Sequence, residues 1–480
     1  MATPIPGNQC EFTLAEIAAA TGAQVRDDLA TKVRGVSIDT RAIATGALFV
    51  ALRGESRDGH DHLDQAIQRG AAAAIVESGR HLAGIVCVEV PDTLVALGQL
   101  AQFHLARMRS VRLLPTIAIG GAAGKTTTKE LTAAAARTVF GDTLATVGNL
   151  NNRIGVPMTI FTLASAHRAA VLECGTNLRG EIDALAQIVQ PDCALVLNVD
   201  LEHTAGIGTL DDVADEEAAL FSTTRRCAIT SSEEPLVLAR IPARLQRLTF
   251  GKSPDSDVRL ESRTVGANGR ARIRIALGPA LCRDDDARRL DLQIDLLGET
   301  AALNCAAAIA GVAAMRGEPL TAGELRAIAD ALAVVQPVAG RLATSSIRGI
   351  RVIDDTYNSN PRSIRAALAA AREVADGLGA RLVIAMGDML ELGAMSREAH
   401  EASVRDVIDL RPAAFVAVGP EMCAAKEVIA ASSTTMLVTA PDSAAAAKLI
   451  ASIVRAGDVL LIKGSRGMAM ERILDSLRTP

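Results

Sequence analysis

The chain is poor in aromatic residues and has no concentration of positive charge. Phe, Trp and Tyr make up 2% of its 480 residues, with no Trp and one Tyr, Tyr357. Because 49% of the residues are hydrophobic, the cores must be built from Ala, Leu, Val and Ile, which suits helices packed closely on sheets. The net charge is −5 and no basic block stands out, so we expect no nucleic-acid partner.

Other absences bear on the cellular compartment. No apolar stretch reaches membrane-spanning length without charges, so we expect no membrane span. Residues 1–12 have neither the basic segment nor the apolar segment of a signal peptide. The eight cysteines are scattered and form no Cys-x-x-Cys pair, which argues against a zinc site or a disulfide framework. Together these features predict a reducing, cytoplasmic location.

The most informative stretch is residues 119–129, Ile-Gly-Gly-Ala-Ala-Gly-Lys-Thr-Thr-Thr-Lys. It follows an apolar run at 113–119 and precedes a helix-forming run at 130–139, which predicts a strand, a glycine turn and a helix. Glycines let the backbone approach a polyphosphate, and the free N–H groups of a helix start point at it. Lys125 supplies a positive charge, and the Thr126 hydroxyl can bind Mg²⁺. The stretch predicts a nucleoside triphosphate site; the alternative is a plain turn between strand and helix.

The pattern of apolar runs predicts an α/β fold with several units. The length corresponds to about three domains, and we place them at 1–112, 113–336 and 337–480. In the second and third, continuous apolar runs alternate with helical stretches, which indicates strands buried on both faces of a parallel sheet. Residues 259–294 instead alternate apolar and charged residues, which predicts an antiparallel insertion on the central domain. The third unit is expected to be doubly wound.

The first unit has weaker signals. Residues 12–20 predict a helix, with Thr13 as N-cap and Glu16 three residues on. Short strands are predicted at 36–41 and 48–52. We therefore expect a small α/β domain.

Two polar residues follow strands of the central sheet. In open parallel sheets, ligands bind at the carboxyl ends of the strands. Glu173 ends the strand predicted at 169–174, which makes it a candidate magnesium ligand, with an ordinary surface glutamate as the alternative. His203 follows the strand at 193–199 through a short loop and is a second candidate, although a lone histidine is more often structural.

Two further segments end strands of the third unit. Residues 354–361, Asp-Asp-Thr-Tyr-Asn-Ser-Asn-Pro, offer carboxylates and amides to a ribose or a polar substrate. Their alternative is an Asn-Pro turn with helix capping by Ser363. Residues 463–467, Lys-Gly-Ser-Arg-Gly, suit an anion, and an ordinary basic loop is the alternative.

Together these segments resemble the Mur ligase family, ATP-dependent amide-bond formers of peptidoglycan synthesis. The N-terminal stretches at 37–41 and 58–61 resemble the family's UDP-sugar domain. The stretches 148–152 and 387–393 resemble the branch that adds D-alanyl-D-alanine to a UDP-N-acetylmuramoyl tripeptide. The other matching stretches are 124–130, 154–157, Glu173 with Gly175, Asn177 and 180–182, His203 with Gly206 and Gly208, 354–361 and 463–468.

The resemblance implies a UDP-substrate domain, a central P-loop ATPase domain and a C-terminal Rossmann-like ligase domain. ATP and Mg²⁺ are the implied cofactors, and a UDP-linked muramyl peptide and a dipeptide amine are the implied substrates. The substrate carboxylate would take the γ-phosphoryl group of ATP, and the amine would then displace phosphate from the acyl phosphate. We expect a monomer, and closure of the last domain would exclude water from the acyl phosphate.

The resemblance also implies residue roles. Lys125, Glu173 and His203 would take part in catalysis, and Thr126, Glu173 and His203 would bind magnesium. The implied nucleotide-binding residues are Gly121, Gly124, Lys125, Thr126, Thr127, Asn304, Arg341 and Asp355. The implied substrate-binding residues are Ser37, Arg41, Asn149, Asn151, Asn152, Asn358, Asn360 and Lys463.

The chain departs from the family pattern in its central domain. Gly120, Ala122 and Ala123 stand where the family loop has Thr, Ser and Asn, and residues 300–301 are Thr-Ala where it has His-Asn. Glu217 stands where the family has a carbamylated lysine, and we expect its carboxylate to supply the same anion and to act in catalysis. Three functions therefore stay open. The first is the ligase that adds D-alanyl-D-alanine to a UDP-N-acetylmuramoyl tripeptide. The others are a paralogue joining another acid and amine, for example in secondary metabolism, and a non-catalytic nucleotide-binding scaffold.

Overall fold

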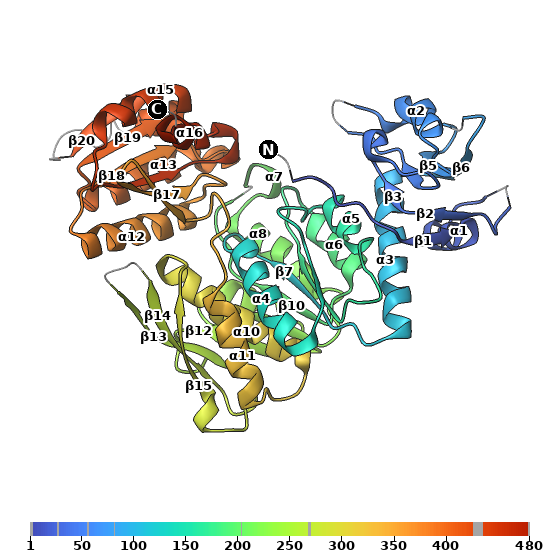
Figure 1. Ribbon diagram of the computed structural model, residues 1–480, viewed down its shortest axis with the longest axis horizontal. Coiled ribbons are helices and arrows are strands. Elements are labelled where there is room, and N and C mark those ends of the chain that lie inside the picture. The colour runs from blue at the N-terminus through green and yellow to red at the C-terminus, as the bar shows by residue number, and fades with distance from the viewer. Residues whose placement is uncertain are drawn as a thin grey trace.

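The computed structural model describes residues 3–25, 28–54, 57–80, 82–202, 204–266, 270–425 and 435–478. Within them the chain forms three lobes, each around its own main sheet (Figure 1). We call them the first lobe (residues 11–111), the middle lobe (116–333) and the last lobe (343–478). The predicted α/β fold with three domains is confirmed.

The first lobe is a small parallel sheet with a two-stranded antiparallel ribbon beside it. Thr13 caps its first helix and forms a capping box with Glu16, as predicted. The strand predicted at 36–41 is too long, because the Asp39 carboxylate accepts from the backbone N–H of Arg41 and turns the chain into a 3-10 helix. The elements are β1 Glu11–Thr13, α1 Leu14–Thr21, β2 Lys32–Arg34, β3 Val36–Ser37, β4 Leu48–Val50, α2 Leu63–Gln68, β5 Ala73–Glu77, β6 Val86–Val90 and α3 Thr93–Val111.

The middle lobe is built on a nine-stranded sheet of order β15-β14-β13-β12-β11-β10-β7-β9-β8. The strands from β8 to β13 are parallel, and β13, β14 and β15 are antiparallel. The predicted antiparallel segment is therefore present, and it extends the same sheet at one edge. The strands are β7 Thr116–Gly120, β8 Thr143–Ala145, β9 Ala169–Glu173, β10 Cys193–Val196, β11 Cys227–Ser231, β12 Gln246–Gly251, β13 Val258–Val265, β14 Ala271–Leu277 and β15 Arg289–Ile294.

Helices cover both faces of this sheet. On one face α4, α10 and α11 pack together over an apolar core rich in Ala and Ile. On the other, α5 and α6 pack against α3, so the first lobe shares a core with the middle lobe. The helices are α4 Lys125–Phe140, α5 Gly155–Ile160, α6 Glu181–Val189, α7 Thr204–Ile207, α8 Leu210–Ala218, α9 Pro235–Leu238, α10 Gly298–Arg316 and α11 Ala322–Ala333.

Among the described residues, α10 alone is long and apolar enough to cross a membrane. However, 83% of its most apolar window is buried inside the protein. The core helix of a folded domain has this character, so α10 is weak evidence for a membrane span.

The last lobe is a six-stranded sheet of order β16-β17-β21-β18-β19-β20, parallel except for β16. Separate apolar cores lie on its two faces, so the predicted doubly wound arrangement is confirmed. The carboxyl ends of β17 and β21 lie side by side, with Asp355 opposite Lys463. The elements are β16 Ala343–Ile347, β17 Ile350–Asp355, α12 Pro361–Leu378, β18 Leu382–Gly387, α13 Ser396–Asp409, β19 Ala414–Val418, α14 Pro420–Ala425, β20 Met436–Ala440, α15 Ser443–Ile453, β21 Val459–Lys463 and α16 Glu471–Arg478.

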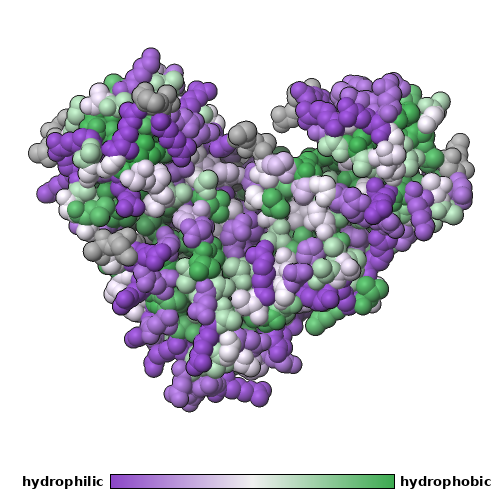
Figure 2. Space-filling model, in the orientation of Figure 1, coloured by the Kyte–Doolittle hydropathy of each residue, from purple (hydrophilic) through white to green (hydrophobic). Residues whose placement is uncertain are grey.

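The three lobes are arranged as a V, with the first and last lobes apart and the middle lobe joining them (Figure 1). In the same view the surface mixes polar and apolar side chains over all three lobes, and an open notch separates the two outer lobes (Figure 2). A cavity lined by residues of the middle and last lobes places the candidate site at their junction.

Candidate active site

The loop after β7 has the conformation that its glycines predict. β7 ends at Gly120 and α4 begins at Lys125, which confirms the expected strand, turn and helix. Gly121 and Gly124 have φ values of +116° and +91°, a region that favours glycine. A Cβ on Gly121 would lie 2.9 Å from the backbone nitrogen of Leu197. The first N–H groups of α4 have no side-chain cap, so they are available to an anion.

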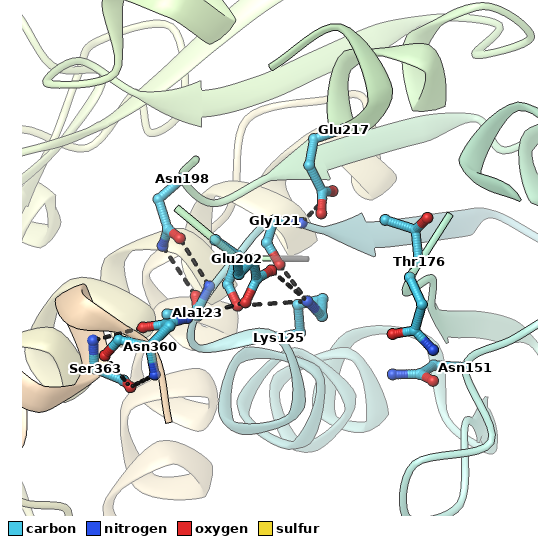
Figure 3. A network of polar contacts seen from close by, with 12 residues as sticks. Gly121, Ala123, Lys125, Asn151, Thr176, Asn198, Glu202, Glu217, Asn360 and Ser363 are labelled. Atoms are coloured by element: carbon cyan, nitrogen blue, oxygen red, sulfur yellow. Dashed lines mark hydrogen bonds and ion pairs between the residues drawn. The ribbon is translucent and has the colours of Figure 1, made fainter. Parts of the chain in front are cut away.

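Asn198, which the sequence interpretation missed, holds this loop in shape (Figure 3). Its Oδ1 accepts from the Ala123 backbone N–H at 2.8 Å, and its Nδ2 donates to the Ala123 carbonyl at 2.9 Å. Asn198 follows β10, which pairs with β7, so the amide stands beside the loop. The backbone of the loop at Ala123 is thus held by a residue that follows the neighbouring strand, although Ala122 and Ala123 have small side chains.

Lys125 is enclosed by oxygen atoms. Its Nζ donates to the Gly121 carbonyl at 2.5 Å and lies 3.6 Å from a carboxylate oxygen of Glu202 (Figure 3). Burial alone lowers the pKa of Lys125, but the carboxylates of Glu202, Glu217 and Glu173 outweigh it and raise that pKa above its ordinary value. The ammonium group is therefore charged at neutral pH, as a phosphate-binding lysine must be.

Glu173 is fully buried, with 0% of its surface exposed. Its Oε1 accepts from the Thr126 hydroxyl at 3.1 Å and from Asn151 Nδ2 at 2.8 Å. Its Oε2 is buried without a hydrogen-bond partner. The alternative of a surface glutamate is therefore wrong, and a carboxylate oxygen beside the helix start is left for another ligand.

Glu217 comes from α8 and lies behind the loop rather than among the residues that line the cavity described below. Its Oε2 accepts from the Gly121 backbone N–H at 2.6 Å (Figure 3). Burial, the largest effect, raises the pKa of Glu217 to about 7, while the Lys125 charge opposes that rise. Its part as a magnesium-facing anion stays a prediction.

A cavity of about 360 Å³ lies in front of the loop, between the middle and last lobes. Residues from both lobes line it, so most predicted nucleotide and substrate residues are brought together. The predicted residues in its lining are Gly124, Lys125, Thr127, Asn149, Asn151, Asn152, Glu173, Asn304, Arg341, Asp355, Asn358, Asn360 and Lys463.

Other predicted residues lie elsewhere. Ser37 and Arg41 belong to the first lobe and do not line this cavity. The guanidinium of Arg41 is paired with Asp39 at 2.7 Å. Asn304, which does line the cavity, stands against the loop, since a Cβ on Gly124 would lie 3.1 Å from its Oδ1. His203 lies outside the described residues, and among the described ones no group of three His, Cys, Asp or Glu side chains could hold a metal.

The last lobe supplies a buried ion pair to the cavity wall. Lys463 is 1% exposed, and its Nζ donates to Asp355 Oδ2 at 2.6 Å and to the Asn358 carbonyl at 2.9 Å. The alternative of an ordinary basic loop is therefore wrong for Lys463. Nearby, the Arg341 guanidinium stacks on the Tyr357 ring at 4.1 Å, which presents a flat cationic surface.

Asn360, and not Ser363, is the N-cap of α12. Its Oδ1 accepts from the Ser363 backbone N–H at 2.8 Å, and Ser363 completes the capping box. Its Nδ2 donates to Glu202 Oε2 at 2.9 Å. Both polar atoms of Asn360 are thus engaged within the protein, and its substrate-binding role stays a prediction.

Comparison with known proteins agrees with this geometry. Three family profiles match the chain: "Mur ligase family, catalytic domain" at residues 32–108, "Mur ligase middle domain" at 119–312, and "Mur ligase, glutamate ligase domain" at 340–466. The chain belongs to the Mur ligase family.

Particular relatives match over nearly the whole length. The chain is 32% identical to the UDP-N-acetylmuramoyl-tripeptide–D-alanyl-D-alanine ligase of Treponema pallidum, over 96% of this chain and 97% of that one. It is also 32% identical to the protein of that name from Escherichia coli, over 95% and 98%. Among solved structures, MurF from Acinetobacter baumannii superposes with a TM-score of 0.85 at 29% identity, over 98% of this chain and 100% of that one. MurF ligase from Thermotoga maritima, solved in complex with ADP, has a TM-score of 0.78 at 25% identity, over 92% and 96%.

Proposed function

We propose that this protein is an ATP-dependent ligase that joins the amine of D-alanyl-D-alanine to the carboxylate of a UDP-N-acetylmuramoyl tripeptide. The observation that carries the proposal is the cavity in which the loop lysine, Lys125, and the buried Glu173 face residues of the last lobe. The printed names of relatives that match nearly end to end support the choice of substrates. We place the reaction in the cytoplasm, by a monomer.

Magnesium fits beside Glu173. A buried carboxylate oxygen without a partner is unfavourable unless a cation or a donor meets it, and Oε2 of Glu173 is such an atom. The Thr126 hydroxyl is within hydrogen-bond distance of the same carboxylate, and hard oxygen ligands are those that Mg²⁺ prefers. We therefore propose Thr126 and Glu173 as ligands, with His203 as a third. Bound there, the ion would neutralise charge on the transferring phosphoryl group.

The reaction has two steps. The tripeptide carboxylate takes the γ-phosphoryl group of ATP, which leaves ADP, and the dipeptide amine then displaces phosphate from the acyl phosphate. Lys125 would leave the Gly121 carbonyl and bind the β- and γ-phosphates, because its raised pKa keeps it charged. The walls contributed by the last lobe would exclude water from the acyl phosphate.

We propose roles for the remaining residues from the resemblance to the Mur ligase family. Glu217 would support the loop from behind as the anion near Lys125. The first, second and third functional units would be 1–112, 113–336 and 337–480. The proposed nucleotide-binding residues are Gly121, Gly124, Lys125, Thr126, Thr127, Asn304, Arg341 and Asp355. The proposed substrate-binding residues are Ser37, Arg41, Asn149, Asn151, Asn152, Asn358, Asn360 and Lys463.

The test is phosphate release from ATP in the presence of Mg²⁺. We expect release only when UDP-N-acetylmuramoyl tripeptide and D-alanyl-D-alanine are both present. Lys125→Ala should abolish it, while Lys252→Ala, at an exposed lysine paired with Glu299, should leave it unchanged. Release with other amines but not with D-alanyl-D-alanine would indicate a ligase of different specificity. ATP binding by calorimetry without phosphate release from any of these mixtures would indicate a nucleotide-binding scaffold without catalysis.

A further inference from the structure

One carboxylate joins the phosphate loop to the last lobe. Glu202 lies in the loop after β10 and is 5% exposed. Its Oε1 is 3.6 Å from Lys125 Nζ in the middle lobe, and its Oε2 accepts from Asn360 Nδ2 at 2.9 Å in the last lobe (Figure 3). The two oxygens of a single side chain thus serve two lobes.

Residues close to Glu202 in the sequence also form hydrogen bonds with the last lobe. Asp200 accepts from the Arg362 backbone N–H at 2.7 Å, and the Thr204 hydroxyl donates to the Leu392 carbonyl at 2.9 Å. A small cavity of about 70 Å³, lined by Glu202 and Asn360 among others, lies in this seam. Asp200, Glu202 and Thr204 therefore all contact the last lobe. Of these three residues, Glu202 also lies beside Lys125 of the phosphate loop.

We propose that Glu202 is a positioning residue, one that sets the orientation of Lys125 and the seating of the last lobe together. The proposal rests on the proposed ligase function. Its carboxylate lies beside the ammonium of Lys125, and its hydrogen bond fixes the start of α12 through Asn360. Since a misplacement of about 1 Å can lower a rate about 100-fold, one side chain that fixes both partners has a strong effect on turnover.

The two contacts can be separated by mutation. Glu202→Gln keeps an oxygen that can accept from Asn360 but removes the charge beside Lys125. Asn360→Asp keeps an oxygen that caps α12 but places a second carboxylate against Glu202. In the double variant, the amide introduced at position 202 can donate to the carboxylate introduced at position 360, which restores the hydrogen bond with donor and acceptor exchanged.

The chain offers a matched control between the same two lobes. Arg263 of β13 and Glu373 of α12 form a two-bond ion pair, at 2.6 and 2.7 Å, and Glu373 does not line the cavity at the phosphate loop. Glu373→Gln is the same chemical change at an interlobe carboxylate that does not touch Lys125. If Glu202 merely held the lobes together, the two amide variants would behave alike.

The experiment measures kcat and KM for ATP in the ligase assay, with ATP binding by calorimetry. We expect each of Glu202→Gln and Asn360→Asp to lower kcat about 10- to 100-fold, with a smaller change in KM for ATP. The double variant should have about the kcat of Glu202→Gln, because the exchanged hydrogen bond offsets the loss caused by Asn360→Asp while the charge beside Lys125 is still absent. Glu373→Gln should stay within about twofold of wild type.

The outcomes separate this proposal from the proposed function. Losses that multiply in the double variant, or an equal loss in Glu373→Gln, would overturn the positioning role while the wild-type activity still stands. If wild type lacks ligase activity, the calorimetric comparison still applies, because Glu202→Gln should change the affinity for ATP at least about threefold and Glu373→Gln should not. Should Glu202→Gln fail to fold, Asn360→Ser keeps a capping oxygen but loses the amide donor. A kcat within about twofold of wild type in that variant would overturn the proposal.

Discussion

Gly120 and Glu217 occupy one space at the end of β7. A Cβ built on Gly120 would lie 2.8 Å from Oε2 of Glu217, the same oxygen that accepts from the Gly121 backbone N–H at 2.6 Å. The two residues are nearly a hundred positions apart in the sequence, where they stood as separate departures from the family pattern. In the structure they are neighbours, because the Glu217 carboxylate occupies the space that a side chain at position 120 would take.

The first prediction tests this fit. Gly120→Ala should destabilise the protein by about 1 to 3 kcal/mol, since a methyl group is forced against a buried carboxylate. In a Glu217→Ala background the same substitution should cost at least about 1 kcal/mol less, because the facing oxygen is gone. Urea unfolding of the four proteins of this cycle measures the difference. If the effects of the two substitutions on the free energy of unfolding were additive, the proposed contact between positions 120 and 217 would be contradicted.

The second prediction concerns pH. The pKa of Glu217 is raised from 4.5 to about 7 by burial, so the folded state binds this proton more tightly than the unfolded state. Ionisation of this buried carboxylate destabilises the folded state relative to the unfolded state. The destabilisation is absent below about pH 4.5 and complete above about pH 7, so the stability of the protein falls as pH rises between them. Glu217→Gln has no carboxylate to ionise at this position. Its free energy of unfolding relative to that of wild type should therefore rise by at most about 3 kcal/mol from pH 4.5 to pH 8.

Urea unfolding of nucleotide-free wild type and Glu217→Gln at pH 5 and pH 8 is the measurement. Glu299→Gln, at an exposed glutamate, is the control for replacing a surface carboxylate by an amide. A constant difference between Glu217→Gln and wild type would show that the carboxylate ionises in the folded protein as it does in the unfolded chain.

Local pattern predicted the parts of the site that depend on short segments. The order of apolar run, glycines and Lys125 predicted the strand, loop and helix, because each element needs only its own neighbours. The position of Glu173 after an apolar run predicted a strand end at the ligand edge. Thr13 and Glu16, three residues apart, predicted the capping box.

Contacts between distant segments could not be predicted in this way. Asn198 holds the loop only because β10 pairs with β7, and nothing in its own neighbourhood distinguishes it from a surface amide. Glu202 meets Asn360 only because two lobes dock. Arg41 pairs with Asp39 in the first lobe, and the sequence does not reveal how far that lobe lies from the cavity. A signal for these contacts would have to come from pairs of positions, which a single sequence does not contain.

The third prediction concerns magnesium at Glu173. In the presence of ADP, Mg²⁺ should raise the melting temperature of wild type, because a ligand near 100 times its Kd adds about 2.7 kcal/mol to the folded state. Glu173→Gln should lose most of this rise, since an amide is a poorer ligand than a carboxylate for a hard cation. Glu299→Gln should keep it. An equal rise in Glu173→Gln would place the ion elsewhere.

The fourth prediction concerns the buried pair of the last lobe. Asp355→Asn leaves the ammonium of Lys463 buried without its countercharge, and breaking a buried pair in this way costs about 3 to 5 kcal/mol. Asp354→Asn is the matched control, because among the described residues the Asp354 carboxylate accepts from Thr356 and from the Gly340 backbone N–H and pairs with no buried cation. Burial raises the pKa of Asp354, so its replacement by a neutral amide should cost less than about 2 kcal/mol.

Hydrogen exchange of the backbone amides in β17 and β21 measures the effect where it arises, because these strands carry Asp355 and Lys463. We expect faster exchange in both strands of Asp355→Asn, with β7 and β10 of the middle lobe unchanged. Lys463→Met should be milder than Asp355→Asn, since it removes the buried charge and keeps an apolar stem of similar length. If Asp354→Asn and Asp355→Asn accelerated exchange equally, the stabilising role would belong to the strand end as a whole and not to the ion pair.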